Sequence, residues 1–232
     1  MPFLFYMNNQ KILIGCPTSQ HKEYSIKEYL EGVENLTYKN FDLVLVDNSE
    51  DETYFNKLKS FGANVVKGKY FESAKDRVID SRNILRKYFL DNEYDYFLSL
   101  EQDVVPPKDV IERLLKHGKE ITGGLYFYLG DDKKTLLPML WVHYNDDYAK
   151  RLMFNEIPEN ELIEVVTCGL GCVLIKREVL EKIEFRHVKD EEPWDDLWFC
   201  EDARKKGFKV YVDTSVKCKH YVKGMDWSKI KK

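Results

Sequence analysis

Short apolar runs alternate with helical segments through the first half of this sequence, and this alternation limits the folds that the chain can adopt. Parallel strands need a long crossover, usually a helix, so strand and helix take turns along the chain. The pattern therefore predicts an α/β fold with a mostly parallel central sheet flanked by helices. The strands are expected at 11–18, 41–46, 63–66 and 94–100, and the helices at 23–36, 51–61, 73–90 and 108–119.

The second half is less regular. Strand-like segments are expected at 121–128, 136–144, 162–168, 172–175 and 208–212, with helices at 177–183 and 197–206. Because several strands follow one another here without a helix between them, the C-terminal part is expected to be mixed or antiparallel. No linker-like stretch interrupts the 232 residues, so residues 1–232 are expected to form a single domain.

Charge and apolar content exclude several classes of protein. The net charge is −4 and no basic block is present, which argues against a nucleic-acid partner. No apolar run reaches the ~18 residues of a membrane span, and the first residues lack the charged start of a signal peptide. The five cysteines, an odd number, indicate reduced and buried thiols. We therefore expect a cytoplasmic protein, free or peripheral to a membrane.

The triplet Glu101-Gln102-Asp103 is the strongest chemical signal. It directly follows the apolar strand expected at 94–100, and Pro106-Pro107 ends the extended segment. Ligands of open α/β sheets bind at the carboxyl ends of strands, and two carboxylates spaced i, i+2 there can reach one divalent cation. An isolated triplet of this kind is usually a solvated turn, so its weight comes from these flanks.

Two further acidic segments occupy comparable places. Asp47-Asn48-Ser49 follows the strand expected at 41–46, where the alternative is that Asp47 only stabilises the next turn. Near the last helix, Asp195-Asp196 and Glu201-Asp202 compete for one role. For Asp195-Asp196 the simpler alternative is an N-cap of that helix.

Taken in order, these segments resemble the GT-A glycosyltransferases, and within them family two and its relatives. The resemblance runs from about Lys11 to His220, nearly the whole chain. Glu101-Gln102-Asp103 is similar to the family's Asp-x-Asp motif, with Glu in place of the commoner first Asp. Asp47-Asn48-Ser49 is similar to its Asp-Asp-Gly-Ser-like turn, and Ser81-Arg82-Asn83 to its Ala-Arg-Asn helix element.

The resemblance also separates the two acidic pairs near the last helix. In the family a Gly-Glu-Asp element precedes this helix, and a Gly closes the helix eleven residues after the second acid. Gly207 stands eleven residues after Asp196, so Asp195-Asp196 matches that element. Glu201-Asp202 would then fall in the middle of the helix. In several relatives a histidine after the last strand, here His220, completes the metal shell.

The resemblance implies a role for each matched residue. Asp196 is implied as the general base of an inverting reaction, with Asp195 orienting hydroxyl groups. A Mn²⁺ or Mg²⁺ ion would be held by Asp103, Glu101 and His220, and an imidazole ligand favours Mn²⁺. The implied donor-binding residues are Pro17, Thr18, Asp47, Asn48, Arg82, Glu101, Gln102, Gly123 and Gly124. The nucleotide-binding half would span about 11–105 and the acceptor-binding half about 106–220, followed by a tail at 221–232.

The implied activity is metal-dependent transfer of a sugar, of the hexosyltransferase type, from a UDP- or GDP-linked donor. The sequence does not identify the acceptor, and a saccharide, a lipid and a protein are the alternatives. Two alternatives stay open. A sugar-phosphate nucleotidyltransferase usually has a Gly-rich loop after the first strand, and residues 16–21 are not Gly-rich. An inactive nucleotide-sugar-binding module is disfavoured by the intact acidic residues.

Overall fold

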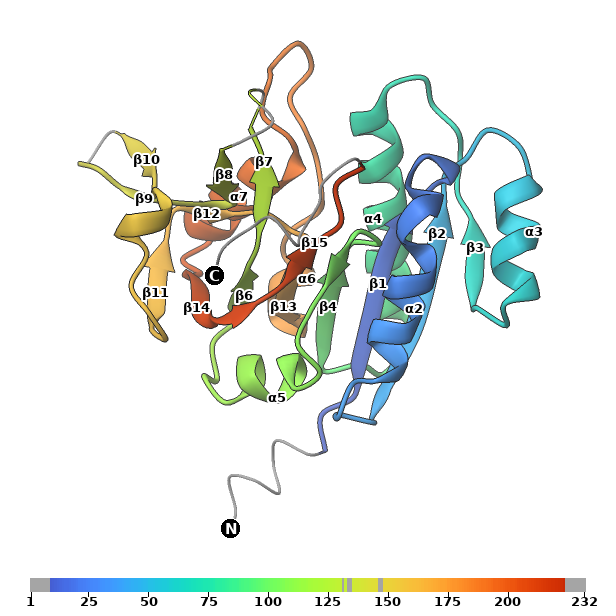
Figure 1. Cartoon of the computed structure of the whole chain (residues 1–232), viewed down its shortest axis with the longest axis horizontal. Helices are drawn as coiled ribbons and strands as arrows, with labels where there is room; N and C mark the ends of the chain where they lie inside the picture. Colours follow the sequence, from blue (N-terminus) through green and yellow to red (C-terminus); the bar gives the residue numbers. More distant parts are fainter. Residues whose placement is uncertain (1–8, 131, 133–134, 146–147, 224–232) are drawn as a thin grey trace.

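The computed structural model describes residues 9–130, 132, 135–145 and 148–223. Its centre is an eight-stranded sheet in the order β11-β14-β6-β13-β4-β1-β2-β3 (Figure 1). Strands β13 and β11 run opposite to the others, so the sheet is mostly parallel. The strands are β1 (Ile12–Thr18), β2 (Phe41–Asp47), β3 (Val65–Lys67), β4 (Tyr96–Leu100), β6 (Ile121–Leu125), β11 (Leu162–Val165), β13 (Cys172–Lys176) and β14 (Val210–Lys217).

Strand β1 shows why these residues form a central strand. All of its residues are buried, and β2 and β4 pair with it in parallel on its two sides. Side chains of a strand alternate between the two faces of a sheet. Ile12 and Ile14 accordingly belong to one hydrophobic cluster, while Leu13 belongs to another. A continuous apolar run is what a strand covered on both faces needs.

Helices cover both faces of the sheet. One cluster joins the sheet to α2 (Ile26–Glu34), α3 (Thr53–Ser60) and α5 (Val110–Leu115). The other joins it to α4 (Ala74–Asp91), α6 (Arg177–Leu180) and α7 (Asp195–Lys205). In α4 the buried side chains of Leu85 and Phe89 are one helical turn apart, and burying each contributes about 1.5–3 kcal/mol. Among the described helices, none has the length and apolar character needed to cross a membrane.

The second half adds three small sheets. One has the order β10-β9-β12, a second pairs β7 with β8, and a third pairs β15 with β5. Strands β7 to β10 lie at the upper left of Figure 1, next to the β11–β14 edge of the large sheet. Their bounds are β5 (Val104–Val105), β7 (Phe127–Leu129), β8 (Leu136–Pro138), β9 (Leu140–His143), β10 (Ala149–Arg151), β12 (Thr167–Cys168) and β15 (Lys219–His220).

Three of the differences from the sequence-based expectations concern α7, β14 and β13. Helix α7 begins at Asp195 instead of residue 197. Its first turn includes Asp195 and Asp196, because negative charges interact favourably with the N-terminal end of the helix dipole. Strand β14 continues to Lys217 instead of ending at residue 212. The antiparallel character of the second half also reaches the interior, because β13 lies between β6 and β4 and is antiparallel to both.

Candidate active site

A cleft of about 1250 Å³ opens where β1, β2 and β4 end. Its wall comes from both halves of the chain, which the eight-stranded sheet joins. The sequence-predicted residues that line it are Pro17, Thr18, Asn48, Arg82, Glu101, Asp103, Asp195, Asp196 and His220. Acidic side chains that are distant in sequence therefore share one cavity.

Asp47 lies behind the wall of this cleft. Its side chain is fully buried, and Oδ1 accepts hydrogen bonds from the backbone N–H and the hydroxyl of Ser49 (3.0 and 2.6 Å). Oδ2 forms an ion pair with Lys67 Nζ at 2.9 Å. The carboxylate thus stabilises the turn after β2, and its contact with a nucleotide stays a prediction.

Three other predicted donor residues also lie outside the lining. Gln102 is fully buried, where its Nε2 donates to the Lys22 carbonyl (2.5 Å) and its Oε1 accepts from Thr18. Gly123 and Gly124 are packed inside β6, where a Cβ on Gly124 would lie 2.9 Å from a valine methyl group. Gln102 thus supports the cleft wall through Thr18 and Lys22, and the roles of all three residues in donor binding remain predictions.

Asp103 and His220 stand together because two short strands pair. The β5–β15 pairing places His220 opposite Val104, next to Asp103 in the chain. His220 Nδ1 lies 2.8 Å from the Phe127 carbonyl, which only accepts, so Nδ1 donates and Nε2 faces Asp103 Oδ2 at 3.3 Å. Burial acts to raise the pKa of Asp103, but His220 and Lys22 outweigh it and lower this pKa to about 2.

Lys22 enters the cleft from η1 (Gln20–Ser25), the short 3₁₀ helix after β1. Its Nζ lies 2.9 Å from both carboxylate oxygens of Asp103 and 3.7 Å from Glu101 Oε2. Burial opposes the charge of Lys22, but the two carboxylates raise the pKa of its ammonium group above the ordinary value. The acid-x-Asp motif therefore already holds a cation.

Arg82 is the most buried cation of the site, with 1% of its side chain exposed. Its Nη2 pairs with Glu101 at 2.6 Å and its Nε with Asp195 at 2.6 Å. Nη1 donates to the Ser99 hydroxyl (2.6 Å). A buried guanidinium needs such partners, because an unpaired charge in the interior costs several kcal/mol.

These contacts form one continuous series of alternating basic and acidic side chains across the cleft. We call it the charge chain, and in order it comprises His220, Asp103, Lys22, Glu101, Arg82 and Asp195. Every cation in its interior touches two carboxylates. The side chains are held in place before any ligand arrives.

Asp196 lies beside the end of the charge chain and has no ion-pair partner among the described residues. Its Oδ1 accepts from the Leu197 N–H (2.8 Å), and its backbone carbonyl accepts from Thr167 Oγ1 (3.3 Å). Burial, and after it the negative charge of Asp195, raises the pKa of Asp196 to about 6. A carboxylate with this pKa can accept a proton near neutral pH.

The competing acidic pair lies elsewhere on α7. Asp202 forms a bidentate contact with Arg186, whose Nε and Nη2 lie 2.6 and 2.8 Å from its oxygens. Glu201 forms an ion pair with Lys205 one turn further on. Neither acid lines the cleft.

A divalent cation fits one part of the site. No group of three histidine, cysteine or acidic residues in the described parts of the chain is close enough to hold a metal by itself. Asp103 and His220 stand together, however, and Mg²⁺ usually takes one or two carboxylates with phosphates completing its shell. The carbonyl of Phe127 orients the imidazole, as partners of metal-binding histidines do. Glu101, tied to Arg82, is the outlying member of the predicted set.

Aromatic rings line the side of the cleft that the second half provides. Tyr126 packs edge to face against His220 with ring centroids 5.4 Å apart, and its hydroxyl accepts from the Gly171 N–H (3.1 Å). Tyr128 on β7 and Trp141 on β9 continue this side. We call Tyr126, Tyr128 and Trp141 the aromatic wall.

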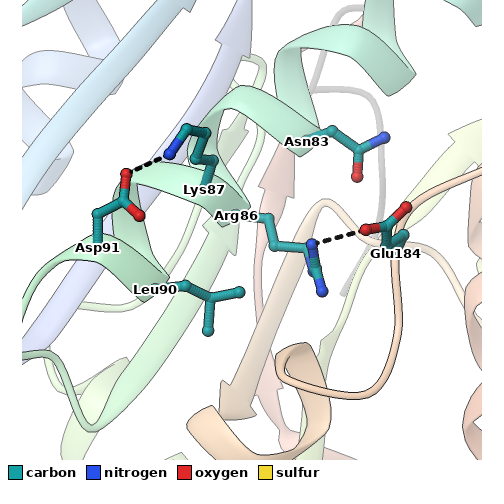
Figure 2. Close-up of a pocket in the computed structure, with 6 residues that line it drawn as sticks. All are labelled: Asn83, Arg86, Lys87, Leu90, Asp91 and Glu184. Atoms are coloured by element: carbon teal, nitrogen blue, oxygen red, sulfur yellow. Dashed lines mark hydrogen bonds and ion pairs between the residues drawn. The ribbon is translucent and has the colours of Figure 1, made fainter.

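A smaller cavity of about 350 Å³ lies between α4 and the segment that carries Glu184 (Figure 2). Its charged groups are paired with each other, Lys87 with Asp91 at 2.7 Å and Arg86 with Glu184 at 3.0 Å. Because these surface pairs neutralise its lining, this cavity does not offer the uncompensated charge of a ligand site.

No protein-family model and no curated protein matches the chain. The fold does match solved structures. The structure of GalNAc-T7 with UDP, GalNAc and Mn²⁺ superposes with a TM-score of 0.66 over 91% of this chain, at 13% sequence identity. This chain has a GT-A fold.

The match covers 44% of the GalNAc-T7 chain, so our chain spans less than half of that protein. A197 from STIV also matches, with a TM-score of 0.48 and 19% identity over 91% of this chain and 86% of that one. At such identities the likeness shows the fold alone. The chemistry must therefore be argued from this chain's own residues.

Sequence reasoning missed several cations of the cleft, among them Lys22 and Arg151. Lys22 stands four residues beyond the end of β1 at Thr18, in a segment without a recognisable motif. Arg151 lies in the irregular region between 130 and 160, where strand-like pieces are short. In both cases only the tertiary structure shows which side chains these cations meet.

Proposed function

We propose that this protein is a glycosyltransferase that moves a sugar from a nucleotide-diphosphate sugar to an acceptor hydroxyl. The main support is the charge chain, whose members Lys22 and Glu101 follow the ends of β1 and β4 in a GT-A fold. A diphosphate gains negative charge as it leaves, and a cation near it stabilises that charge. Asp103 holds one such cation, the ammonium group of Lys22, inside the cleft.

The donor nucleotide would lie at the end of the cleft formed by Pro17, Thr18 and Asn48, with UDP or GDP as its nucleotide part. Arg82 would act through its neighbours, because its guanidinium is already tied to Glu101 and Asp195. It is a positioning residue that fixes the two carboxylates facing the sugar.

Asp103 and His220 would hold the divalent ion, with Mn²⁺ favoured over Mg²⁺ because one ligand is an imidazole. When bound, the ion supplies Lewis-acid stabilisation of the departing diphosphate. Lys22 must then leave its place beside Asp103, and the phosphates offer its ammonium group a new partner.

In the transfer step of an inverting enzyme, the acceptor oxygen forms a bond to the anomeric carbon. The bond from that carbon to the diphosphate oxygen breaks, and its electron pair leaves with the diphosphate. The proton of the acceptor hydroxyl passes to the carboxylate of Asp196, whose raised pKa suits it to accept that proton. Asp195, fixed by Arg82, would orient the hydroxyl groups. The transferred sugar would be a hexose.

Calorimetric titrations with UDP and with GDP, each with and without Mn²⁺, test this proposal. We expect wild-type protein to bind one of them more tightly with Mn²⁺, and Asp103→Asn to lose the metal-dependent part. Asp109→Asn, which changes a half-exposed carboxylate at the start of α5, is the matched control. If neither nucleotide binds, or if Asp103→Asn binds like wild type, the proposal is wrong. Pyrophosphate as a reaction product would instead indicate a nucleotidyltransferase.

A further inference from the structure

Arg151 is a cation of the cleft that the proposed reaction leaves unused. It lies at the end of β10, and its guanidinium carbon is 5.0 Å from the Tyr128 ring centroid and 4.4 Å from that of Trp141. Its Nη1 donates to the Tyr128 hydroxyl (2.8 Å). The guanidinium is therefore held against the aromatic wall, with little freedom to move.

Among the residues that the structure describes, this guanidinium has no negative partner. Within the described parts of the chain no carboxylate forms an ion pair with Arg151, whereas Arg82 has two such pairs. Its Nε is buried and makes no hydrogen bond. A guanidinium has five N–H donors, and the bond to Tyr128 uses one of them. Partial burial of an uncompensated charge is costly, and contact with rings offsets only part of that cost.

The position of Arg151 relative to the proposed base follows from strand pairing. Arg151 is directly opposite Trp141, and Trp141 is directly opposite Thr167. Residues directly opposite each other point to the same face of a sheet, and all three line the cleft. Two strand spacings separate Arg151 from Thr167, roughly 10 Å between the backbones. Thr167 in turn binds the backbone of Asp196.

We propose that Arg151 binds an anionic group of the acceptor, either a carboxylate or a phosphate. The acceptor would then be an acidic molecule, such as a uronic acid residue or a sugar phosphate. Its reactive hydroxyl would meet Asp196 while its anionic group meets Arg151, whose planar guanidinium matches both anions in bidentate geometry. This inference rests on the proposed glycosyltransferase function and specifies the acceptor class.

The donor diphosphate is the competing occupant. Lys22 and His220 stand beside Asp103, where the diphosphate is expected, while Arg151 lies on a different sheet, β10-β9-β12. The geometry therefore favours the acceptor as the source of the anion. The two sources can be separated by experiment.

The test compares charged probes with neutral counterparts by calorimetry. One arm uses methyl glucuronide against methyl glucoside, and the other uses glucose 6-phosphate against glucose, so that the arms separate carboxylate from phosphate. We expect at least one charged probe to bind wild type about tenfold or more tightly than its counterpart. Arg151→Gln should abolish this preference, and Arg151→Lys should retain part of it.

Lys150→Gln is the matched control, because Lys150 is the neighbour on the same strand and pairs with Glu156. It should retain the preference. Titrations are made without nucleotide and with UDP or GDP, whichever binds wild type, so that failure of donor binding is seen separately. The inference is wrong if neither charged probe is preferred, or if the preference survives Arg151→Gln. A loss of nucleotide affinity in Arg151→Gln would assign the anion to the donor and equally overturn it.

Discussion

The two sides of the cleft differ in how their positively charged side chains are paired. In the charge chain Lys22 and Arg82 each meet two carboxylates, so the site is neutralised internally. On the aromatic wall Arg151 meets two rings and, among the described residues, no acid. The first arrangement fixes side chains in advance and must rearrange to admit a diphosphate and a metal ion. The second leaves one charge for a ligand to neutralise.

The largest expected effect separates the two acidic pairs of α7. Asp196→Asn should lower kcat by about 10² to 10⁴, because the amide cannot take the acceptor proton. Asp202→Asn is the matched control, since it breaks a contact to Arg186 outside the cleft. Steady-state kinetics of both variants show which acidic pair supplies the general base. A larger loss of kcat in Asp202→Asn would mean that the base has been assigned to the wrong pair.

Removing each arginine should sharpen the contrast between the two sides. Arg82→Met leaves Glu101 and Asp195 without their shared cation, so we expect a loss of about 3–5 kcal/mol in the free energy of unfolding. Arg151→Met leaves no carboxylate of the described residues without a partner, so it should lower the free energy of unfolding by about 1 kcal/mol or less. Urea denaturation of both variants measures these losses. Similar losses of unfolding free energy in the two variants would contradict the difference in charge pairing between Arg82 and Arg151.

Lys22 should compete with the metal ion for Asp103. In Lys22→Met we expect the affinity for Mn²⁺ alone to rise about tenfold, because a like charge has left the site. Electron paramagnetic resonance of free Mn²⁺ gives this affinity without any turnover. Lys27→Met, which changes a highly exposed lysine on α2, should leave it unaltered. An unchanged affinity in Lys22→Met would show that the ammonium group does not occupy the metal position.

The smallest effect is a pH dependence. The base works as a carboxylate, and the pKa of Asp196 is raised to about 6, so kcat/KM should fall as the pH drops through this value. The rate should reach about half of its plateau near pH 6. In Asp196→Asn this acid limb should disappear from the rate profile. A limb that persists in the variant would belong to another group.

Much of the fold could be predicted from the sequence, because each apolar run and helix of the first half has a local signature. The continuous apolar run of β1 identifies a strand buried on both faces, and the spacing of Leu85 and Phe89 identifies the buried side of α4. The antiparallel place of β13 could not be predicted in this way. It depends on which neighbours the strand finds after a turn, and local patterns do not encode that.

Only some of the residues of the site could be predicted from the sequence. Asp103 and Asp196 were selected through the resemblance to the family's motifs, and both line the cleft. The depth of Asp47 and Gln102 did not, because their burial is set by partners such as Lys67 and Tyr54 from other elements. Lys22 and Arg151 could not be identified as site residues from the sequence, because the role of a cation depends on neighbours that only the tertiary structure shows.

The most direct test of the charge chain as a diphosphate site is release of nucleotide from a donor. Wild-type protein and Asp103→Asn are incubated with UDP- and GDP-sugars and Mn²⁺, and free UDP and GDP are quantified, with circular dichroism confirming that both proteins are folded. We predict that wild type releases one of the two nucleotides. Asp103→Asn should release it at a rate at least about 100-fold lower. Equal release by the two folded proteins would contradict the proposed site.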